Sequence, residues 1–290
     1  ESLVDSVLLD SCFKHEDELL VIDDCSTDTS PDLARAKGAK VVLMNQNSGP
    51  SAARNRGAQE AKNDILFFLD ADTFLESGSI KAVKEHFRES KSTPCVNGWC
   101  SMTPISPGVG QAYKGLVEYF WHMEFFKKES NISCFNTRVG ALLRQAFVDT
   151  GGFSTAYLKA EVEDYEFSYR LIKKYTISLN KKSRVRHDFP GIAGTIKDYW
   201  SRAGKWIELF FNRKSFDNGG TSASNGLGHL IGALFPMISL LIFFEPLFLL
   251  LSLFFVATFL FLFKNFFSLV LKEKGIKFLL LSVLLHLFYS

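Results

Sequence analysis

The chain has 290 residues, which is long enough for one full domain and a smaller appendage. Its 33 Lys and Arg nearly balance its 31 Asp and Glu, so the strongly basic surface typical of nucleic-acid-binding proteins is excluded. The five cysteines have no Cys-x-x-Cys spacing, and this pattern favours reduced thiols in a cytosolic domain.

Strand-like and helical segments alternate through the N-terminal part of the chain. The predicted elements, in chain order, are a strand at Leu19–Ile22, a helix at Ser30–Lys37, a strand at Val41–Met44, a helix at Ser48–Ala61 and a strand at Ile65–Leu69. Gly38, directly after the first of these helices, is a typical helix-terminating residue. The alternation predicts an α/β domain with a mostly parallel sheet, in which ligands bind outside the carboxyl ends of the strands.

Acidic residues follow two of the predicted strands. Asp23 and Asp24 come directly after the first strand, and Asp70-Ala71-Asp72 follows the third. Two carboxylates separated by one residue offer the hard oxygen ligands that Mg²⁺ or Mn²⁺ prefers, and such an ion can neutralise a departing diphosphate. An acidic loop that caps the following helix is the alternative interpretation of the second cluster.

Motifs between Glu18 and His187 resemble those of the family-2 glycosyltransferases, which have the GT-A fold. LLVIDDCSTDTS and NSGPSAARNRGAQEAKNDILFFLDADT resemble the nucleotide-binding half of that family, and GALLRQAFVDTGGF and EVEDYEFSYRL resemble its acceptor half. The resemblance implies an α/β fold with a GT-A-type nucleotide-binding sheet flanked by helices. It departs from the family at the start, where Glu1–Phe13 supplies a helix and the family's first strand is not found.

The resemblance implies a donor-binding set on the first acidic loop, the following helix and the second acidic cluster. Asp23, Asp24 and Ser26 would hydrogen-bond the base and the ribose. Arg54 would reach the nucleotide or its phosphates as a forked donor, and Asp70 would approach the ribose or a metal-bound water. The residues alone leave other roles open, namely an Asx-type turn with a helix cap for the first loop and a solvated helix side chain for Arg54.

Metal-binding residues are also implied by the resemblance. Asp72 would ligate the ion, and His187, after a predicted strand at Ser183–Arg186, completes the metal shell in several branches of the family. Imidazole suits Mn²⁺ better than Mg²⁺, and either ion is an expected cofactor. A purely structural His187 is the alternative.

The pair Glu163-Asp164 resembles the family's catalytic acidic pair, whose second member is the general base. A carboxylate against an acceptor hydroxyl can remove its proton as the new bond forms. The pair begins a predicted helix at Tyr165–Lys174, so a helix cap favoured by the helix dipole is the alternative. Upstream, Gly151-Gly152-Phe153 is expected to turn the chain and to place Phe153 under the acceptor pocket.

The composition changes sharply near Gly226. Leu230–Phe244 and Leu247–Phe263 are each about long enough to cross, or nearly cross, a bilayer as a helix, and Glu245-Pro246 between them suits a tight turn. A lysine-rich link leads to a third apolar stretch, Phe278–Tyr289. Since basic loops stay in the cytoplasm, the sequence predicts a multi-pass membrane protein whose N-terminal domain is cytoplasmic.

An aromatic and basic segment, TIKDYWSRAGKWIELFFNR, precedes these apolar stretches and suits a helix in the headgroup region. A plain amphipathic core helix is the alternative. Processive polysaccharide synthases carry a QxxRW motif near this position, and the Gln is absent from this chain, which favours transfer of one or a few sugars. The predicted units are a catalytic domain at residues 1–195, an interfacial segment at residues 196–226 and a membrane region at residues 227–290 with two to three transmembrane helices.

The sequence therefore predicts an inverting, metal-dependent, hexosyltransferase-type enzyme. Its expected partners are a nucleotide-diphosphate sugar, a lipid-linked or cell-envelope glycan acceptor with a reacting hydroxyl or phosphate, and the membrane; no nucleic acid is expected. A nucleotidyltransferase is a rival, although no Gly-rich phosphate loop is visible. A membrane-anchored scaffold with this fold but no turnover is a second rival, although the acids at Asp72 and Asp164 are both present.

Overall fold

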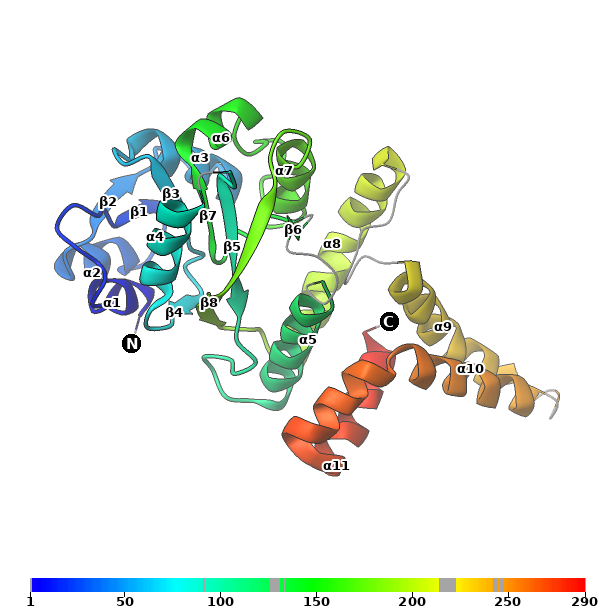
Figure 1. Ribbon diagram of the computed structural model, residues 1–290. Coiled ribbons are helices and arrows are strands. Elements are labelled where there is room, and N and C mark those ends of the chain that lie inside the picture. The colour runs from blue at the N-terminus through cyan, green and yellow to red at the C-terminus, as the bar shows by residue number, and fades with distance from the viewer. Residues whose placement is uncertain are drawn as a thin grey trace.

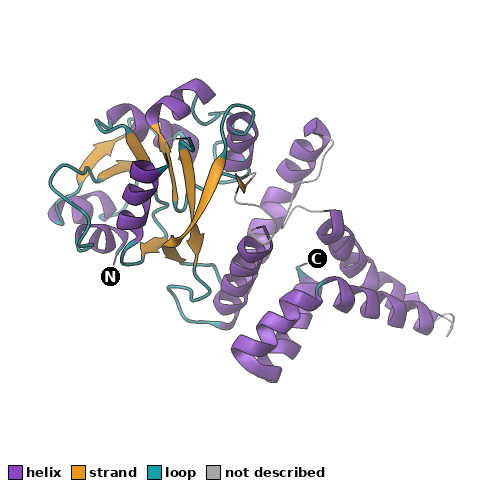
Figure 2. Ribbon diagram, viewed as in Figure 1, coloured by secondary structure: helices purple, strands orange, loops and turns teal. Residues whose placement is uncertain are grey.

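The computed structural model describes residues 2–90, 92–125, 131–132, 134–213, 223–241, 245 and 248–289. The described residues up to His187 form strands and helices and are called the strand region; the described residues after it form helices alone (Figures 1 and 2). The strands are β1 (Leu20–Asp23), β2 (Lys40–Leu43), β3 (Ile65–Phe68), β4 (Thr73–Leu75), β5 (Cys95–Cys100), β6 (Asn131–Ile132), β7 (Gly140–Leu143) and β8 (Ile177–His187).

The helices alternate with these strands in the first region and then continue without strands. They are α1 (Leu3–Leu8), α2 (Ser30–Ala36), α3 (Gly49–Glu60), α4 (Ser79–Glu89), α5 (Val109–Phe125), α6 (Arg144–Thr150), α7 (Glu163–Leu171), α8 (Ile192–Arg213), α9 (Ala223–Leu240), α10 (Phe248–Leu262) and α11 (Lys264–Phe288). The five elements predicted between Leu19 and Leu69 are confirmed, with ends that agree to within one residue. Gly38 has φ +96°, a conformation that favours glycine, at the turn after α2.

The strands form two sheets, and the prediction of a mostly parallel sheet is wrong for the larger one. β1 and β2 pair in parallel as a small sheet, whereas the larger sheet has the order β3-β7-β5-β8-β4, with β6 beside β8. In the larger sheet only β5 and β8 are parallel among the described pairs. The alternation near the N-terminus does not fix the direction of β7, which comes more than seventy residues after β3 and pairs antiparallel with it.

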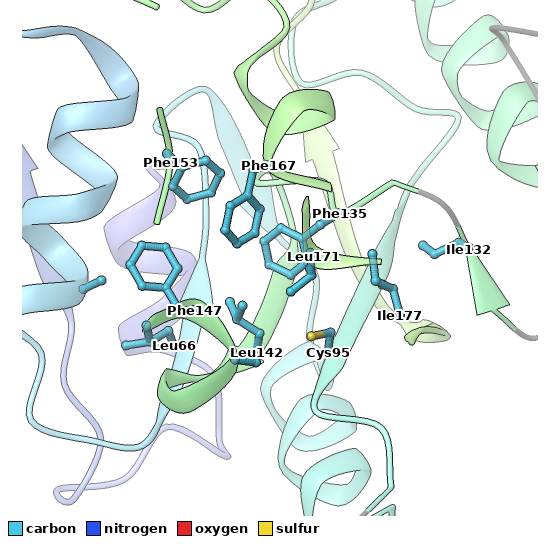
Figure 3. Close-up of a cluster of buried hydrophobic side chains, with 12 residues drawn as sticks. Leu66, Cys95, Ile132, Phe135, Leu142, Phe147, Phe153, Phe167, Leu171 and Ile177 are labelled. Atoms are coloured by element: carbon cyan, nitrogen blue, oxygen red, sulfur yellow. The ribbon is translucent and has the colours of Figure 1, made fainter. Parts of the chain in front are cut away.

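An aromatic core lies between the larger sheet and helices α6 and α7 (Figure 3). The rings of Phe153 and Phe167 lie 4.4 Å apart, and Phe68 meets Phe153 edge-on at 5.6 Å. Gly151 and Gly152 both have positive φ, so the predicted chain turn before Phe153 is confirmed. Phe153 itself is a buried core residue, and this packing fixes the positions of the residues that lie over it.

Helix α5 joins the strand region to the C-terminal helices. Its buried side chains Tyr113, Leu116 and Val117 belong to one apolar cluster with Phe263 and Phe266 at the junction of α10 and α11. Helix α8 runs beside α5 in the same part of the molecule (Figure 1). The aromatic stretch around α5 therefore packs against the C-terminal helices rather than being a surface segment.

The C-terminal helices differ in detail from the predicted spans. α9 and α10 overlap the first two apolar stretches, while Pro246, Phe244 and Leu247 at the predicted turn lie outside the described residues. The lysine-rich link is helical instead, because α11 begins at Lys264 and runs to Phe288, with a break in helical geometry at Gly275. Lys is the most frequent residue of this link and a good helix former, which agrees with the observed helix.

Taken one at a time, the described helices do not meet the usual requirements for crossing a bilayer. None of them has both the length and the apolar composition that a span needs, whereas α10 and α11 satisfy the test as a pair joined at a bend of 69°. The predicted transmembrane topology stays a prediction.

Candidate active site

Arg54 lies at the centre of a cluster that brings two separate acidic motifs together. Its Nη2 donates to Asp70 Oδ1 at 2.8 Å, and its Nη1 donates to Glu163 Oε1 at 3.0 Å. The guanidinium carbon lies 5.6 Å from the centre of the Phe153 ring, and the Arg54 side chain is only 14% exposed. One forked cation therefore links α3, the loop after β3 and the start of α7 over the aromatic core.

This arrangement changes the interpretation of Arg54 and Asp70. Arg54 is not a solvated helix side chain, because both of its terminal nitrogens bind carboxylates. Asp70 also accepts a longer hydrogen bond from Thr137 Oγ1, at 3.4 Å. Direct contacts of Arg54 and Asp70 with a donor nucleotide stay a prediction, and the structure gives both residues a role in holding the site together.

The acidic pair at the start of α7 divides into a held carboxylate and an accessible one. Glu163 is buried; its Oε1 binds Arg54, and its Oε2 accepts the Glu161 N–H at 2.7 Å. Asp164 is half-buried, and its Oδ1 accepts the N–H of Tyr165 at 2.9 Å. The geometry assigns Glu163 to positioning and leaves Asp164 as the better candidate for proton transfer.

The electrostatic surroundings of Asp164 suit a base that operates near neutral pH. The pKa of Asp164 is raised to about 7, mainly by burial and also by the neighbouring charge of Glu163. The guanidinium groups of Arg54 and Arg138 act in the opposite direction and lower the pKa. A carboxylate with a pKa near the working pH is an effective proton acceptor.

Asp72 and His187 meet at the edge where β4 pairs with β8. Thr73 lies opposite His187 in the antiparallel register, and His187 Nε2 lies 3.1 Å from Asp72 Oδ2. Burial raises the pKa of Asp72, but the hydrogen bond and charge of His187, with the charge of Arg138, give a net lowering. The Asp72 side chain is 57% exposed, so its carboxylate is open to a ligand.

The donor set of this pair fits a divalent ion. Neighbouring ligand atoms on an octahedral ion with bonds of ~2.1 Å are about 3 Å apart, as the Asp72 and His187 atoms are. Within the described residues, no third His, Cys, Asp or Glu completes a ligand group, and the buried Nδ1 of His187 has no hydrogen-bond partner. These two side chains can supply part of a coordination shell, with the rest left to substrate oxygens and water.

The first acidic loop forms a local turn and a helix cap, as the alternative interpretation expected. Both Asp23 oxygens accept the N–H of Ser26, at 3.3 and 3.4 Å. The Asp24 carboxylate accepts the N–H groups of Ser48 and Gly49, each at 2.7 Å, at the start of α3. These contacts fix β1 against α3, and nucleotide binding by Asp23, Asp24 and Ser26 stays a prediction.

Arg138, in the loop before β7, is a site residue that the sequence patterns did not identify. Its Nη2 donates to Glu118 Oε2 at 3.2 Å, and Glu118 Oε1 accepts Lys114 Nζ at 3.1 Å. Lys114 also donates to the Tyr199 hydroxyl at 2.8 Å. Burial opposes the ionisation of Glu118, but Arg138 and Lys114 lower its pKa. Lys114, Glu118 and Arg138 therefore form a row of ionised side chains that leads from Tyr199 on α8 towards Asp164.

One part of this row of ionised side chains could have been recognised in the sequence. Lys114 and Glu118 are charged residues four apart within an otherwise aromatic helix, the spacing at which helical side chains pair. Arg138 had no comparable local signal, because its partner is twenty residues away on another element.

Comparison with known families and curated proteins gives several matches. The model of the family described as Glycosyl transferase family 2 matches residues 1–152. The minor teichoic acid biosynthesis protein GgaA of Bacillus subtilis is 34% identical over 97 residues, covering 30% of this chain and 22% of the relative. A poly-beta-1,6-N-acetyl-D-glucosamine synthase of Staphylococcus epidermidis is 24% identical over 208 residues, covering 64% and 50%.

Solved structures give the same fold. A mannosyltransferase from Pyrobaculum calidifontis, in complex with GDP-Man and Mn²⁺, matches with a TM-score of 0.50 at 15% identity, over 91% of this chain and 68% of that one. The chain spans half or less of the length of the curated relatives it matches. The predicted GT-A-like α/β fold, with a sheet flanked by helices, is confirmed.

Proposed function

The chain belongs to glycosyl transferase family 2, and from this membership and the Arg54 cluster we propose that it is an inverting hexosyltransferase. It would move a sugar from a nucleotide-diphosphate sugar to an acceptor hydroxyl. The observation that carries the proposal is the link through Arg54, which joins Asp70 to Glu163 and so supports one site for their neighbours Asp72 and Asp164.

The reaction is a single displacement. Asp164 takes the proton of the acceptor hydroxyl while the acceptor oxygen attacks the anomeric carbon. The bond from that carbon to the diphosphate breaks on the opposite face, and the nucleoside diphosphate leaves with the electron pair. A Mn²⁺ or Mg²⁺ ion bound by Asp72 and His187 would neutralise the diphosphate as a Lewis acid.

Each side chain of the cluster has a separate task in this proposal. Arg54 holds the Glu163 carboxylate in place, so that the start of α7 presents Asp164 at a constant position. Arg138 lowers the pKa of Asp164 and so keeps part of it ionised at neutral pH, despite burial. Asp23 and Asp24 hold the loop where the base and ribose would bind.

The acceptor is proposed to be a cell-envelope or lipid-linked glycan. Two of the relatives are named for teichoic acid or poly-N-acetylglucosamine synthesis, which supports an envelope polymer as the acceptor class. Anchoring at a membrane is part of the proposal, and the support is the outward exposure of Leu and Met side chains on α9, such as Leu230 and Met237. A surface of this kind would hold the site near a lipid-linked substrate.

A panel of nucleotide sugars tests the function directly. The purified protein would be incubated with UDP-, GDP- and dTDP-sugars, with and without Mn²⁺, and nucleotide release would be measured with and without an envelope glycan. Release from one donor class, stimulated by Mn²⁺ and by the glycan, is expected. If no donor releases nucleotide under any of these conditions, the transferase proposal is wrong and the scaffold alternative is favoured.

A further inference from the structure

Helix α11 folds back on itself at Gly275. The backbone of Gly275 has φ 77° and ψ 179°, which is outside the helical range and in the region that favours glycine. The Phe266 ring before this break stacks on the His286 ring after it, with centroids 4.9 Å apart. The two halves of α11 therefore lie side by side as a helical hairpin, visible as the orange and red parts of the helix in Figure 1.

The tip of this hairpin extends away from the apolar cluster that holds its base. At a helical rise of ~1.5 Å per residue, Gly275 lies about 14 Å along the axis from Phe266. Phe266 and Val270 are buried in the cluster, whereas residues 271–274 and 276–277 are exposed. Apart from its own turn, no atom lies within 4 Å of the position that a Cβ on Gly275 would take. The tip is therefore an open surface.

The exposed side chains of the tip combine positive charge with apolar surface. Residues 271–277 contain three lysines and one glutamate. Among the described residues, only Lys272 of these lysines has a carboxylate within ion-pair distance, namely that of Glu273 at 3.8 Å. Beside the ammonium groups, Leu271 is 46% exposed and Ile276 is 59% exposed. The tip thus presents a net positive charge around two apolar side chains.

This combination distinguishes between anionic partners. A soluble phosphate polymer would neutralise the lysines but would leave Leu271 and Ile276 in water. An anionic bilayer offers phosphates at its surface and hydrocarbon directly beneath them, so that lysines stay in the headgroup layer while apolar neighbours enter the acyl boundary. The tip does not suit the centre of the bilayer, because charged side chains are costly there. Both kinds of side chain therefore match the headgroup layer.

We propose that the tip of α11, residues 271–277, binds the headgroups of anionic lipids, with Lys274 and Lys277 at the phosphates and Ile276 in the acyl boundary. The inference rests on the membrane anchoring proposed above and not on the transferase chemistry. Anchoring through α9 alone would accept any lipid surface, and the tip adds selection for a negatively charged one. Because the base of the hairpin shares an apolar cluster with α5, the bound surface would have a fixed position relative to the strand region.

Vesicle flotation separates the tip from apolar anchoring. The purified chain is mixed with increasing amounts of vesicles, either of phosphatidylcholine or of equal parts phosphatidylcholine and phosphatidylglycerol. The measured quantity is the lipid concentration that floats half of the protein. The parent is expected to need at least about tenfold less of the anionic lipid, since each lysine near such a surface contributes about fivefold to binding. The double variant Lys274→Gln, Lys277→Gln should lose most of this preference and bind phosphatidylcholine as the parent does.

The matched control is the double variant Lys181→Gln, Lys182→Gln on β8, which removes the same charge from two exposed lysines of the strand region. It should keep the parent's preference for anionic vesicles. Equal losses in the two double variants, or no preference in the parent, would overturn the lipid assignment.

A third measurement identifies a soluble partner. Calorimetric titration with inorganic polyphosphate that binds the parent but not the tip variant, together with no vesicle preference, would assign the tip to a soluble polyanion instead of lipid. Flotation with phosphatidylcholine alone reports apolar anchoring, and nucleotide release reports turnover. Failure of either earlier proposal is therefore seen separately from failure of this one.

Discussion

The strand region and the C-terminal helices both bury an apolar cluster, but they differ in what surrounds it. The strand region buries Phe68, Phe153 and Phe167 and places the charged cluster of Arg54 above them. In the C-terminal helices Leu and Met side chains face outwards, while His286 is buried. The comparison teaches that the first region is organised around buried charge pairs, whereas the second exposes many apolar side chains on its outside.

If the strand region carries out the chemistry, a substitution at Asp72 should have the largest effect on turnover. Asp72→Asn keeps the size of the side chain but removes a charged oxygen ligand, so turnover is expected to fall almost completely, and EDTA should do the same to the parent. The measurement is nucleotide release with Mn²⁺ present, and circular dichroism checks the fold. Full activity in EDTA would contradict the metal assignment.

Replacing the proposed base should separate catalysis from binding within the same region. Asp164→Asn removes the proton acceptor, so kcat is expected to fall by roughly 10²–10⁴, the usual contribution of a general base. Donor KM should stay close to that of the parent. A rise in donor KM with kcat intact would make Asp164 a binding residue.

The buried charge pairs of the strand region should be visible in stability. Arg54→Ala leaves the buried Glu163 and the partly buried Asp70 without their cation, and breaking a buried pair of this kind typically costs about 3–5 kcal/mol. Arg56→Ala on the same helix is the control, because Arg56 is half-exposed and pairs with Glu60, a contact worth at most ~1 kcal/mol. Urea unfolding of both variants gives the comparison; equal losses would show that Arg54 does not hold the site.

The pH dependence of kcat tests whether buried charge tunes the base. Asp164 must be ionised to accept a proton, and its pKa is raised to about 7, so kcat should rise as the pH increases through that value. Arg138 lowers this pKa, as does Arg54, while Glu163 raises it. Arg138→Gln should therefore move the midpoint to higher pH, and Arg138→Lys, which keeps the charge, should move it less. A midpoint that both variants leave unchanged would remove Arg138 from the site.

Sequence patterns predicted the parts of the strand region that depend on neighbouring residues. β1, β2 and β3 are short apolar runs bounded by turn residues, and acidic residues stand at the ends of β1 and β3. The antiparallel insertion of β7 was not predictable in this way, because its partner β3 lies more than seventy residues earlier in the chain. The links from Arg54 to Glu163 and from Arg138 to Glu118 could not be predicted either, because each joins residues that are far apart in the sequence.

The C-terminal helices show a different limit. α10 contains only apolar residues apart from Ser252 and Thr258, so no face is marked for the interior and its packing could not be derived from periodicity. The inward set of Tyr113, His286 and Tyr289 is brought together from α5 and from the C-terminal end of α11, which no local pattern records.

The smallest expected effect on folding, and the sharpest test of the comparison, lies on the outside of the helices. Met237 on α9 is 65% exposed, and Leu43 on β2 is 55% exposed. Changing either to Lys should alter the free energy of unfolding by no more than about 0.5 kcal/mol, as is usual for surface positions.

If only the helical surface contacts lipid, Met237→Lys should lower the fraction of protein recovered with floated phosphatidylcholine vesicles several-fold, since an apolar side chain worth ~1.5 kcal/mol or more leaves the bilayer contact. Leu43→Lys should leave recovery unchanged. Equal recovery of the parent and both variants would mean that the outward Leu and Met side chains of α9 do not meet lipid, and the contrast between the two regions would then need a protein partner as its explanation.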